Sequence, residues 1–138
     1  MAPDLIENLE KLRARLNARL KPGEKEHGLT VTSCCRCPHW NNLKGGATDS
    51  WHLYDPAAGK ASHAADVWCR TRPTREVYQA ALDIPAFRGI GLSPPWPGSP
   101  GYVHVDVRPN LLRVQWGYNH RGLTVALAAV LPANWIEV

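Results

Sequence analysis

Two segments of the chain repeat apolar residues with the period of a helix. In residues 4–20, leucine and isoleucine recur at spacings of three and four, and Pro22 follows. This spacing lines the apolar side chains along one side of an amphipathic helix. Residues 74–86 repeat the pattern in a stripe formed by Val77, Ala80, Ala81 and Ile84. The pattern therefore predicts two helices, each with one face for a hydrophobic core.

Other segments alternate between apolar and polar residues, as a strand does. In the clearest, residues 102–108, valine occupies positions 103, 105 and 107, and the polar residues are His104, Asp106 and Arg108. Side chains alternate between the two faces of a strand, so the valines face the core and the polar residues share the other face. Three further strands are predicted at residues 29–33, 64–69 and 112–118. The last is expected to return as the partner of residues 102–108.

The remaining segments lack a clear period. Residues 34–63 are rich in Cys, Gly, Asn, Asp and His and are predicted to form an ordered loop, while four prolines make residues 93–101 a loop. Residues 122–131 are apolar but of no clear type. The order of elements predicts an α+β fold with a small, mostly antiparallel sheet and flanking helices packed to one side. We expect residues 1–138 to form a single domain, with a site on the open face of the sheet.

Composition and charge narrow the class of protein. The 138 residues are 44% hydrophobic and 20% charged, which is typical of a globular protein. No run of eighteen apolar residues is present, so we expect no membrane span. The net charge of +4 is scattered and accompanies no nucleic-acid-binding motif, so we expect no nucleic-acid partner. No signal peptide is visible in the first residues, which have neither a basic nor an apolar stretch.

Histidine and aspartate concentrate in two places. His104 and Asp106, on one face of the predicted strand, lie about 7 Å apart at the backbone, so both can converge on one metal ion or one water. An exposed polar face is the alternative explanation. The loop at residues 50–66 adds two histidines and two aspartates. Imidazole with carboxylate is a usual ligand set for catalytic zinc, so these segments together predict a zinc site.

Short motifs in a fixed order resemble a known family. They include Ser-Trp-His-Leu at 50–53 and Tyr-Val-His-Val-Asp-Val-Arg at 102–108. The others lie at residues 32–38, 42, 45–46, 59–61, 64–67 and 89–92. The ordered set resembles the zinc D-alanyl-D-alanine carboxypeptidase family, over roughly residues 29–110. The resemblance implies the fold shared with the hedgehog signalling domain, a bound Zn²⁺ ion and peptidoglycan peptides as the partner.

The same resemblance implies roles for individual residues. His52, in the Ser-x-His motif, would be the first zinc ligand, Asp66 the second and His104 the third. Arg36 would orient the substrate by binding its carboxylate, because a guanidinium matches two carboxylate oxygens. Ser50 would hold the backbone or carboxylate of the substrate.

This chain departs from the family pattern at the first two ligands. The family spaces its histidine and aspartate seven residues apart, whereas His52 and Asp66 are fourteen apart. An inserted loop would explain the difference. His63 is the alternative ligand, because it lies only three residues before Asp66.

The second departure concerns the general base. The family's acid near the last ligand is often a glutamate a few residues upstream, but this chain has no glutamate between Glu76 and Glu137. Asp106 is therefore the expected catalytic base. The alternative is that Asp106 is a ligand and His104 lies outside the metal site.

The function that follows is zinc-dependent hydrolysis of amide bonds in peptidoglycan stem peptides or cross-links, as a carboxypeptidase or an endopeptidase. Zinc polarises a peptide carbonyl and lowers the pKa of water, and a nearby carboxylate takes the proton. The small size, basic charge and lack of a visible signal favour a phage or prophage protein, such as an endolysin. Such a protein is made in the cytoplasm and reaches the cell wall through a holin or within a virion. The sequence predicts no oligomeric state.

Two alternatives belong to other functional classes. The first is a non-catalytic, metal-stabilised binding module of the same fold, which is favoured if Asp106 faces away from the ion. The second is a small zinc protein that contacts nucleic acid and binds its metal through the Cys-x-x-Cys pair, Cys34 and Cys37.

The cysteines and tryptophans have several explanations. Without a secretion signal, reduced or structural thiols are the default. A disulfide with Cys69 and a second metal or redox site are the alternatives for the group Cys34, Cys35, Cys37 and Cys69. Trp68 and Trp116 are expected in the core, whereas Trp51 and Trp96 lie on loops beside the predicted site, either as walls of a substrate groove or as local packing.

Overall fold

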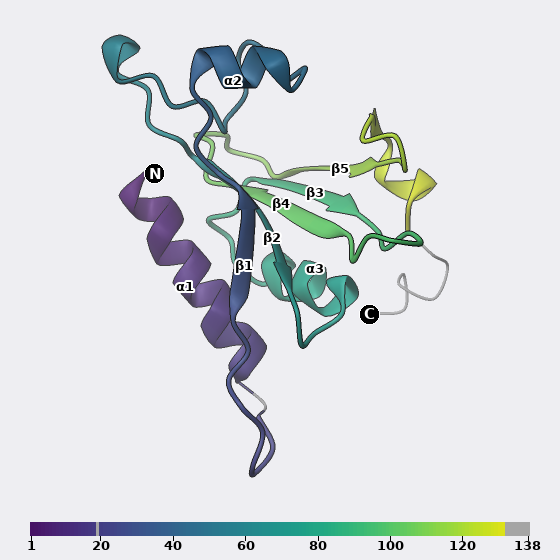
Figure 1. The fold of residues 1–138 in the computed structure, drawn as a ribbon. Helices are drawn as coiled ribbons and strands as arrows, with labels where there is room; N and C mark the ends of the chain where they lie inside the picture. Colours follow the sequence, from purple (N-terminus) through teal and green to yellow (C-terminus); the bar gives the residue numbers. More distant parts are fainter. Residues whose placement is uncertain (19, 132–138) are drawn as a thin grey trace.

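A six-stranded sheet forms the centre of the computed structural model, which describes residues 1–18 and 20–131 (Figure 1). Its strands are β1 (Leu29–Ser33), β2 (Ala64–Cys69), β3 (Gly89–Ser93), β4 (Tyr102–Asp106), β5 (Val114–Tyr118) and β6 (Thr124–Val125). They lie in the order β1-β2-β4-β3-β5-β6, with β3 and β5 parallel and the other neighbours antiparallel. The predicted α+β class and mostly antiparallel sheet are confirmed.

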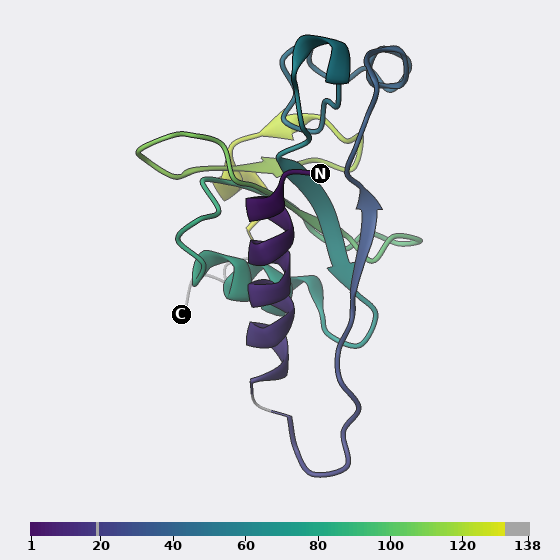
Figure 2. The ribbon, with the colours of Figure 1, turned by 90° about the vertical axis from the view of Figure 1, so that its left-hand side faces the viewer.

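Two helices, α1 (Pro3–Asn17) and α3 (Thr74–Leu82), pack on one face of this sheet (Figures 1 and 2). Proline at the first helical position of α1 needs no amide hydrogen there, and Leu5, Leu12 and Leu16 form its buried stripe. Both predicted helices are confirmed, but each ends earlier than predicted. Helix α3 stops at Leu82 because Pro85, three residues on, has no amide hydrogen to continue the ladder.

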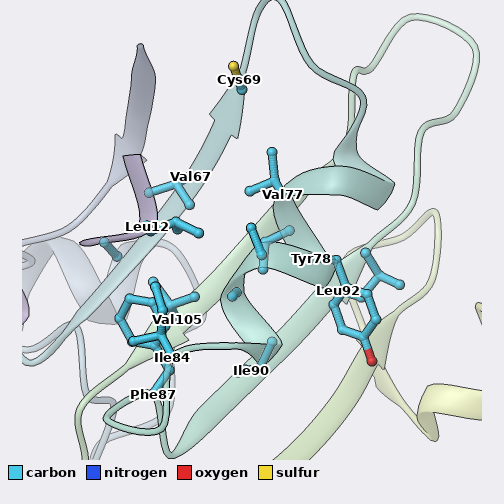
Figure 3. Packing of buried hydrophobic residues seen from close by; sticks show 14 of the residues in the cluster. Leu12, Val67, Cys69, Val77, Tyr78, Ile84, Phe87, Ile90, Leu92 and Val105 are labelled. Carbon is cyan, nitrogen blue, oxygen red and sulfur yellow. The ribbon is translucent and has the colours of Figure 1, made fainter. Parts of the chain in front are cut away.

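The core lies between these helices and the apolar side chains of the central strands. Figure 3 shows Val67 of β2, Ile90 of β3 and Val105 of β4 in the same cluster as Leu12 of α1 and Val77 of α3. All five side chains are fully buried. The alternation along each strand then turns the intervening residues of β2, β3 and β4 to the opposite face, which carries the candidate site.

The partner predicted for the strand at 112–118 is wrong. Strand β5 does not pair with β4. It pairs in parallel with β3, which lies between them. Strand β3 was not predicted, because glycine at positions 89 and 91 lowers the strand propensity of a five-residue segment.

The predicted loop at 34–63 contains two short helical elements. Helix α2 (Pro38–Leu43) begins with Pro38, and the Cys37 sulfur accepts a hydrogen bond from the amide of Trp40 at its N-terminus. The single turn η1 (Pro56–Ala58) lies further along. Six and three residues are too few to show a helical period, so the sequence pattern could not reveal them.

Residues 122–131 form strand β6 and the single turn η2 (Leu127–Ala129), while residues 132–138 lie outside the described residues. None of the helices in the described part of the chain has the length and apolar character needed to cross a membrane.

Candidate metal centre

Strand register and one loop bring histidine and aspartate side chains together. Asp66 on β2 is the register partner of His104 on β4, so their side chains are neighbours on the same face. His52 comes from the loop between α2 and β2. The backbone amide of Arg36 donates to the carbonyl oxygen of His52 (2.9 Å), which holds this loop beside the chain that leaves β1. Residues far apart in the sequence thus meet on the face opposite the helices.

The three side chains converge with one atom each. His104 Nδ1 lies 3.1 Å from His52 Nε2 and 3.0 Å from Asp66 Oδ1, and His52 Nε2 lies 3.3 Å from Asp66 Oδ1. All three residues are buried. Within residues 1–18 and 20–131, no other group of three or more histidine, cysteine or acidic side chains is spaced to hold a metal ion.

The outer hydrogen bonds of the two imidazoles determine where their lone pairs point. His52 Nδ1 donates to the carbonyl oxygen of Cys34 (3.0 Å), and His104 Nε2 donates to Asp106 Oδ2 (2.8 Å). Both acceptors are oxygens without a hydrogen of their own, so these two nitrogens carry the ring protons. In the neutral rings, the lone pairs of His52 Nε2 and His104 Nδ1 then point toward the Asp66 carboxylate. Three lone pairs directed at one another form a cation site.

Donor types and spacing both fit zinc. Two imidazole nitrogens and a carboxylate oxygen are typical of catalytic zinc sites, which keep a fourth position open. Ligand atoms held tetrahedrally at about 2.0–2.2 Å lie roughly 3.3–3.6 Å apart, so small shifts of these side chains would accommodate the ion. The separations here are 3.1, 3.0 and 3.3 Å. The outer bonds to a carboxylate and a carbonyl are the partners that zinc-binding histidines usually have. The residues present therefore fit Zn²⁺.

These contacts shift the pKa values of the acid and the base in opposite directions. Burial raises the pKa of Asp66, but hydrogen bonds with His104 and His52 outweigh burial and hold the pKa of this carboxyl well below its usual range. Burial lowers the pKa of His104, but hydrogen bonds with Asp106 and Asp66 outweigh it and raise the pKa of the ring. Zinc binding at these atoms therefore competes with protonation of the His104 ring.

Asp106 lies on the far side of the His104 ring from the three converging atoms. Besides accepting from His104, it accepts from Arg108, whose Nε donates to Oδ1 (2.7 Å) and Nη2 to Oδ2 (2.6 Å). Burial raises the pKa of Asp106, yet the hydrogen bonds from Arg108 and His104 bring it down to about 2. The guanidinium carbon of Arg108 lies 5.6 Å from the ring centroid of Trp51 and 5.2 Å from that of Trp116. Asp106 is therefore an ionised, fully buried partner of His104.

Two glycines of β3 make room for this arrangement. A Cβ at Gly89 would overlap the Asp106 carboxylate, and a Cβ at Gly91 would overlap the indole of Trp116. The side chains between and after them, Ile90 and Leu92, point into the core. The alternation of glycine with large apolar residues is the signal that could have identified β3, as a strand without side chains at the first two positions of its site face.

The cluster lies in a cleft of about 520 Å³ that also contains both predicted substrate-binding residues. Arg36 Nη2 lies 3.6 Å from Asp66 Oδ2, while Arg36 Nε donates to Ser33 Oγ (3.1 Å). Ser50 Oγ accepts from the amide of His52 (3.3 Å). Asp49 and Asp66 are the two acidic residues that line this cleft in the described part of the chain.

Aromatic side chains make up much of the remaining cleft wall. They are Trp51, Tyr102, Trp116 and Tyr118. The prediction that Trp116 fills the core is wrong, because positions 116 and 118 of β5 face the site. Gln115, which precedes Trp116, reaches the helix side and accepts from the Tyr78 hydroxyl (2.9 Å). Burial raises the pKa of Tyr102 to about 12 and that of Tyr118 further, so both hydroxyls are neutral hydrogen-bond donors at the cleft.

Sequence reasoning missed the two tyrosines, although the signal was available. Tyr102 has the same parity as His104 on β4, and Tyr118 has the same parity as Trp116 on β5. Residues of one parity share a face of a strand, so the tyrosines follow from the alternation once the site face is known.

His63 lies outside the cluster. Its ring meets that of Trp51 edge to face, with centroids 6.0 Å apart, and its carbonyl accepts from the amide of Val107. Of the two histidines considered from the sequence, the structure brings His52 beside Asp66. The loop between His52 and Asp66 leaves the site, forms the exposed turn η1 and returns to the site at Asp66.

All four cysteines are free thiols. The sulfur atoms of Cys34 and Cys35 lie 3.8 Å apart, and burial raises the pKa of Cys34 to about 11. The part of Cys34 that contacts the metal centre is its carbonyl oxygen, which holds His52. A backbone group has no sequence signature, so only the fold could reveal this contact.

Comparison with known proteins identifies a family for this chain. The family model described as Peptidase M15 matches residues 2–106, which include every residue of the cluster. No curated protein matches the chain. The match agrees with the resemblance that was drawn from the sequence motifs.

Proposed function

Because this chain belongs to the peptidase M15 family, the zinc D-alanyl-D-alanine carboxypeptidase family, we propose that it is a zinc peptidase acting on the peptides of peptidoglycan. Membership supports a metallopeptidase. The peptidoglycan substrate, and the choice between carboxypeptidase and endopeptidase action, are the finer parts of the proposal. So is origin from a phage or prophage, with holin- or virion-mediated access to the wall.

One observation carries the proposal. His52 Nε2, Asp66 Oδ1 and His104 Nδ1 lie within 3.3 Å of one another at the cleft, with lone pairs directed at a common point. Three protein ligands leave one of the four zinc positions open, as catalytic sites do and closed structural sites do not.

A bound zinc ion would polarise the scissile carbonyl and lower the pKa of the attacking water. The chain's own residues would bind and orient the peptide. Arg36, whose side chain is one-fifth exposed at the cleft, would bind a substrate carboxylate with the N–H groups that do not contact Ser33. Ser50 would accept or donate a hydrogen bond to the peptide backbone, and the Tyr102 and Tyr118 hydroxyls supply further donors.

The proton acceptor has two candidates. Asp106 is the base expected from the sequence, but its carboxylate contacts the outer nitrogen of His104 and is fully occupied by Arg108. Asp49 lines the cleft and is exposed, so it can reach a substrate from the loop before Ser50. We favour Asp49 as the acceptor and Asp106 as the residue that orients His104.

The direct test is hydrolysis of purified muropeptides by zinc-loaded protein, with and without a chelator. We expect cleavage that stops on chelation and returns with zinc. Release of free D-alanine from an uncross-linked pentapeptide indicates a carboxypeptidase, and splitting of cross-linked dimers indicates an endopeptidase. No cleavage of any muropeptide by protein with one bound zinc would reject the proposal.

A matched pair of variants ties the activity to the cluster. His52→Ala removes a proposed ligand, and His63→Ala removes the other histidine of the same segment without touching the cluster. We expect zinc binding and hydrolysis to be lost in the first variant and retained in the second. Loss in His63→Ala alone would show that His63 is the ligand, and retention of zinc binding in both variants would show that neither residue is.

A second function is favoured by one feature of the site. The orientation of Asp106 away from the converging atoms suits a non-catalytic, metal-stabilised binding module. Such a module binds zinc and gains stability from it, but hydrolyses none of the muropeptides. The muropeptide assay therefore separates the two functions.

A further inference from the structure

A second groove lies next to the cleft. It has a volume of about 570 Å³, within the range of small-ligand sites, and is formed by the proline-rich loop after β3 and the turn between β5 and β6. Tyr102 and Gly122 line both the groove and the cleft. A ligand in the cleft that extends past Tyr102 therefore enters the groove.

An exposed tryptophan, Trp96, lines the groove and is held in a rigid turn. Trp96 is 38% exposed, although it is one of the largest apolar side chains of the protein. Its amide donates to the carbonyl of Ser99 (3.1 Å), and the Ser99 amide donates back (2.8 Å). Prolines at 94, 95, 97 and 100 restrict φ throughout this turn. An exposed ring that is held in place before binding loses little conformational entropy when a ligand covers it.

The rest of the groove lining has polar side chains among apolar groups and carries no fixed charge. His120 is its only ionisable side chain apart from Tyr102, among the described residues, and packs edge to face on Trp96 with centroids 5.6 Å apart. Asn119 Oδ1 accepts from the amides of Arg121 and Leu123, which orients the side chain and leaves its NH₂ group as a donor. The cleft, in contrast, is lined by Arg36, Lys44 and Arg108 as well as its acids.

These observations point to a neutral ligand with both an apolar face and hydroxyl or amide groups. A pyranose ring has C–H groups on one face, which are attracted to the electron-rich face of an indole. Its hydroxyl and acetamido groups match the hydroxyl, amide and imidazole groups around Trp96. A charged peptide would gain nothing from a lining without charge.

From this geometry we infer that the groove binds an N-acetylated sugar of the glycan to which the peptide substrate is attached. The inference rests on the proposed function for the identity of the substrate. The peptide occupies the charged cleft, and the sugar lies beyond Tyr102 against Trp96. The protein thus recognises saccharide and peptide of one substrate together.

The test compares two exposed tryptophans. Trp96→Ala removes the indole ring on which the sugar would lie. Trp40→Ala is the matched control, because Trp40 on α2 is 48% exposed and lines neither the cleft nor the groove. Trp96→Tyr restores an aromatic face and guards against a folding defect. The first measurement is calorimetric titration with chitotetraose, an N-acetylglucosamine oligomer. The second is kcat/KM for a disaccharide-linked pentapeptide and for the same pentapeptide without sugar.

We expect Trp96→Ala to weaken chitotetraose binding about tenfold or more, while Trp40→Ala changes it little and Trp96→Tyr retains most of it. The same variant should lower kcat/KM about tenfold for the disaccharide-linked peptide, mainly through KM, and leave the free peptide unaffected.

Three results would overturn the inference. They are no binding of chitotetraose by the unmodified protein, equal effects of the two alanine variants, and equal loss of kcat/KM on both substrates, which would make the groove a peptide site. If neither substrate is hydrolysed, the proposed function fails, and the chitotetraose titration still decides whether the groove binds sugar.

Discussion

The two faces of strand β4 are buried almost equally but for different reasons. Val103 and Val105 have no exposed surface, and neither does Asp106, while His104 is 5% exposed. On the helix side, removal of apolar surface from water stabilises the strand by roughly 25 cal/mol per Å². On the other side, burial of a ring and a carboxylate costs free energy unless every polar atom is paired.

The polar face meets this cost with a continuous set of partners. Arg108 donates to Asp106, Asp106 accepts from His104, and His104 meets Asp66 and His52. The chain of contacts ends at the three lone pairs that suit a cation. The comparison teaches that burial on the helix face serves folding, whereas burial on the site face holds two imidazoles in one tautomer and orientation.

The largest expected effect is the loss of zinc binding and activity when the third ligand, His104, is removed. His104→Ala is expected to abolish peptidase activity and to lower zinc affinity by more than the roughly 10–100-fold typical of an outer-shell change. Calorimetric zinc titration measures the affinity, and thermal unfolding with and without zinc gives a second readout. Val105→Ala, the neighbour on the other face, serves as control and should retain zinc binding. Zinc affinity unchanged in His104→Ala would contradict the ligand set.

A substitution on the helix face should lower the stability of the protein and leave its zinc affinity unchanged. Phe87 is fully buried in the core, so Phe87→Ala is expected to lower the free energy of unfolding by about 3–5 kcal/mol through lost burial and a cavity. Urea denaturation measures this loss. Zinc affinity, measured at a temperature where the variant is folded, should stay at the level of the unmodified protein. A parallel loss of zinc affinity in the folded variant would show that the two faces are coupled.

Removing the charge of Asp106 tests whether this residue orients His104 or acts as the general base. Asp106→Asn keeps the shape but weakens the acceptor for His104 Nε2, so zinc affinity should fall about 10–100-fold. Asp49→Asn is the companion variant and should lose hydrolysis while binding zinc normally. If Asp106→Asn instead abolishes hydrolysis with zinc affinity intact, Asp106 is the general base, as the sequence suggested.

The smallest effect concerns the space that glycine leaves on the site face. Gly91→Ala places a methyl group against Trp116, and we expect overpacking to destabilise the protein by about 1–3 kcal/mol. Gly28→Ala is the matched control, because a Cβ at this exposed position meets no atom within 4 Å. Equal stability of the two variants in urea would show that β3 and β5 adjust without cost.

Much of the fold could be predicted from local patterns. The apolar stripes of α1 and α3, the strand at residues 29–33 and the alternation in β4 all follow from the backbone periods of helix and strand. Helix α2 and strand β3 could not be predicted in the same way. The first is too short to repeat a period, and the second has glycine on the face where an alternating pattern would have shown polar residues.

The candidate site could be predicted in part. The pairing of His104 with Asp106 on one face was visible in the sequence, and the family resemblance implied His52 and Asp66. Three features of the site were not predicted. They are the bidentate bonds from Arg108 to Asp106, the bond between the Cys34 carbonyl and His52, and the contacts that form the groove at Trp96. They depend on how loops return to the sheet, which no local spacing encodes.

The sequence by itself determined which side chains share a face, because covalent geometry makes successive residues of a strand alternate. Only the tertiary structure decided that Asp66 stands opposite His104, that His52 and not His63 joins them, and that Asp106 binds the outer nitrogen of the ring. Those outcomes depend on strand register and loop path. Register and path are set by packing between segments distant in the chain, and that packing is the information a linear pattern lacks.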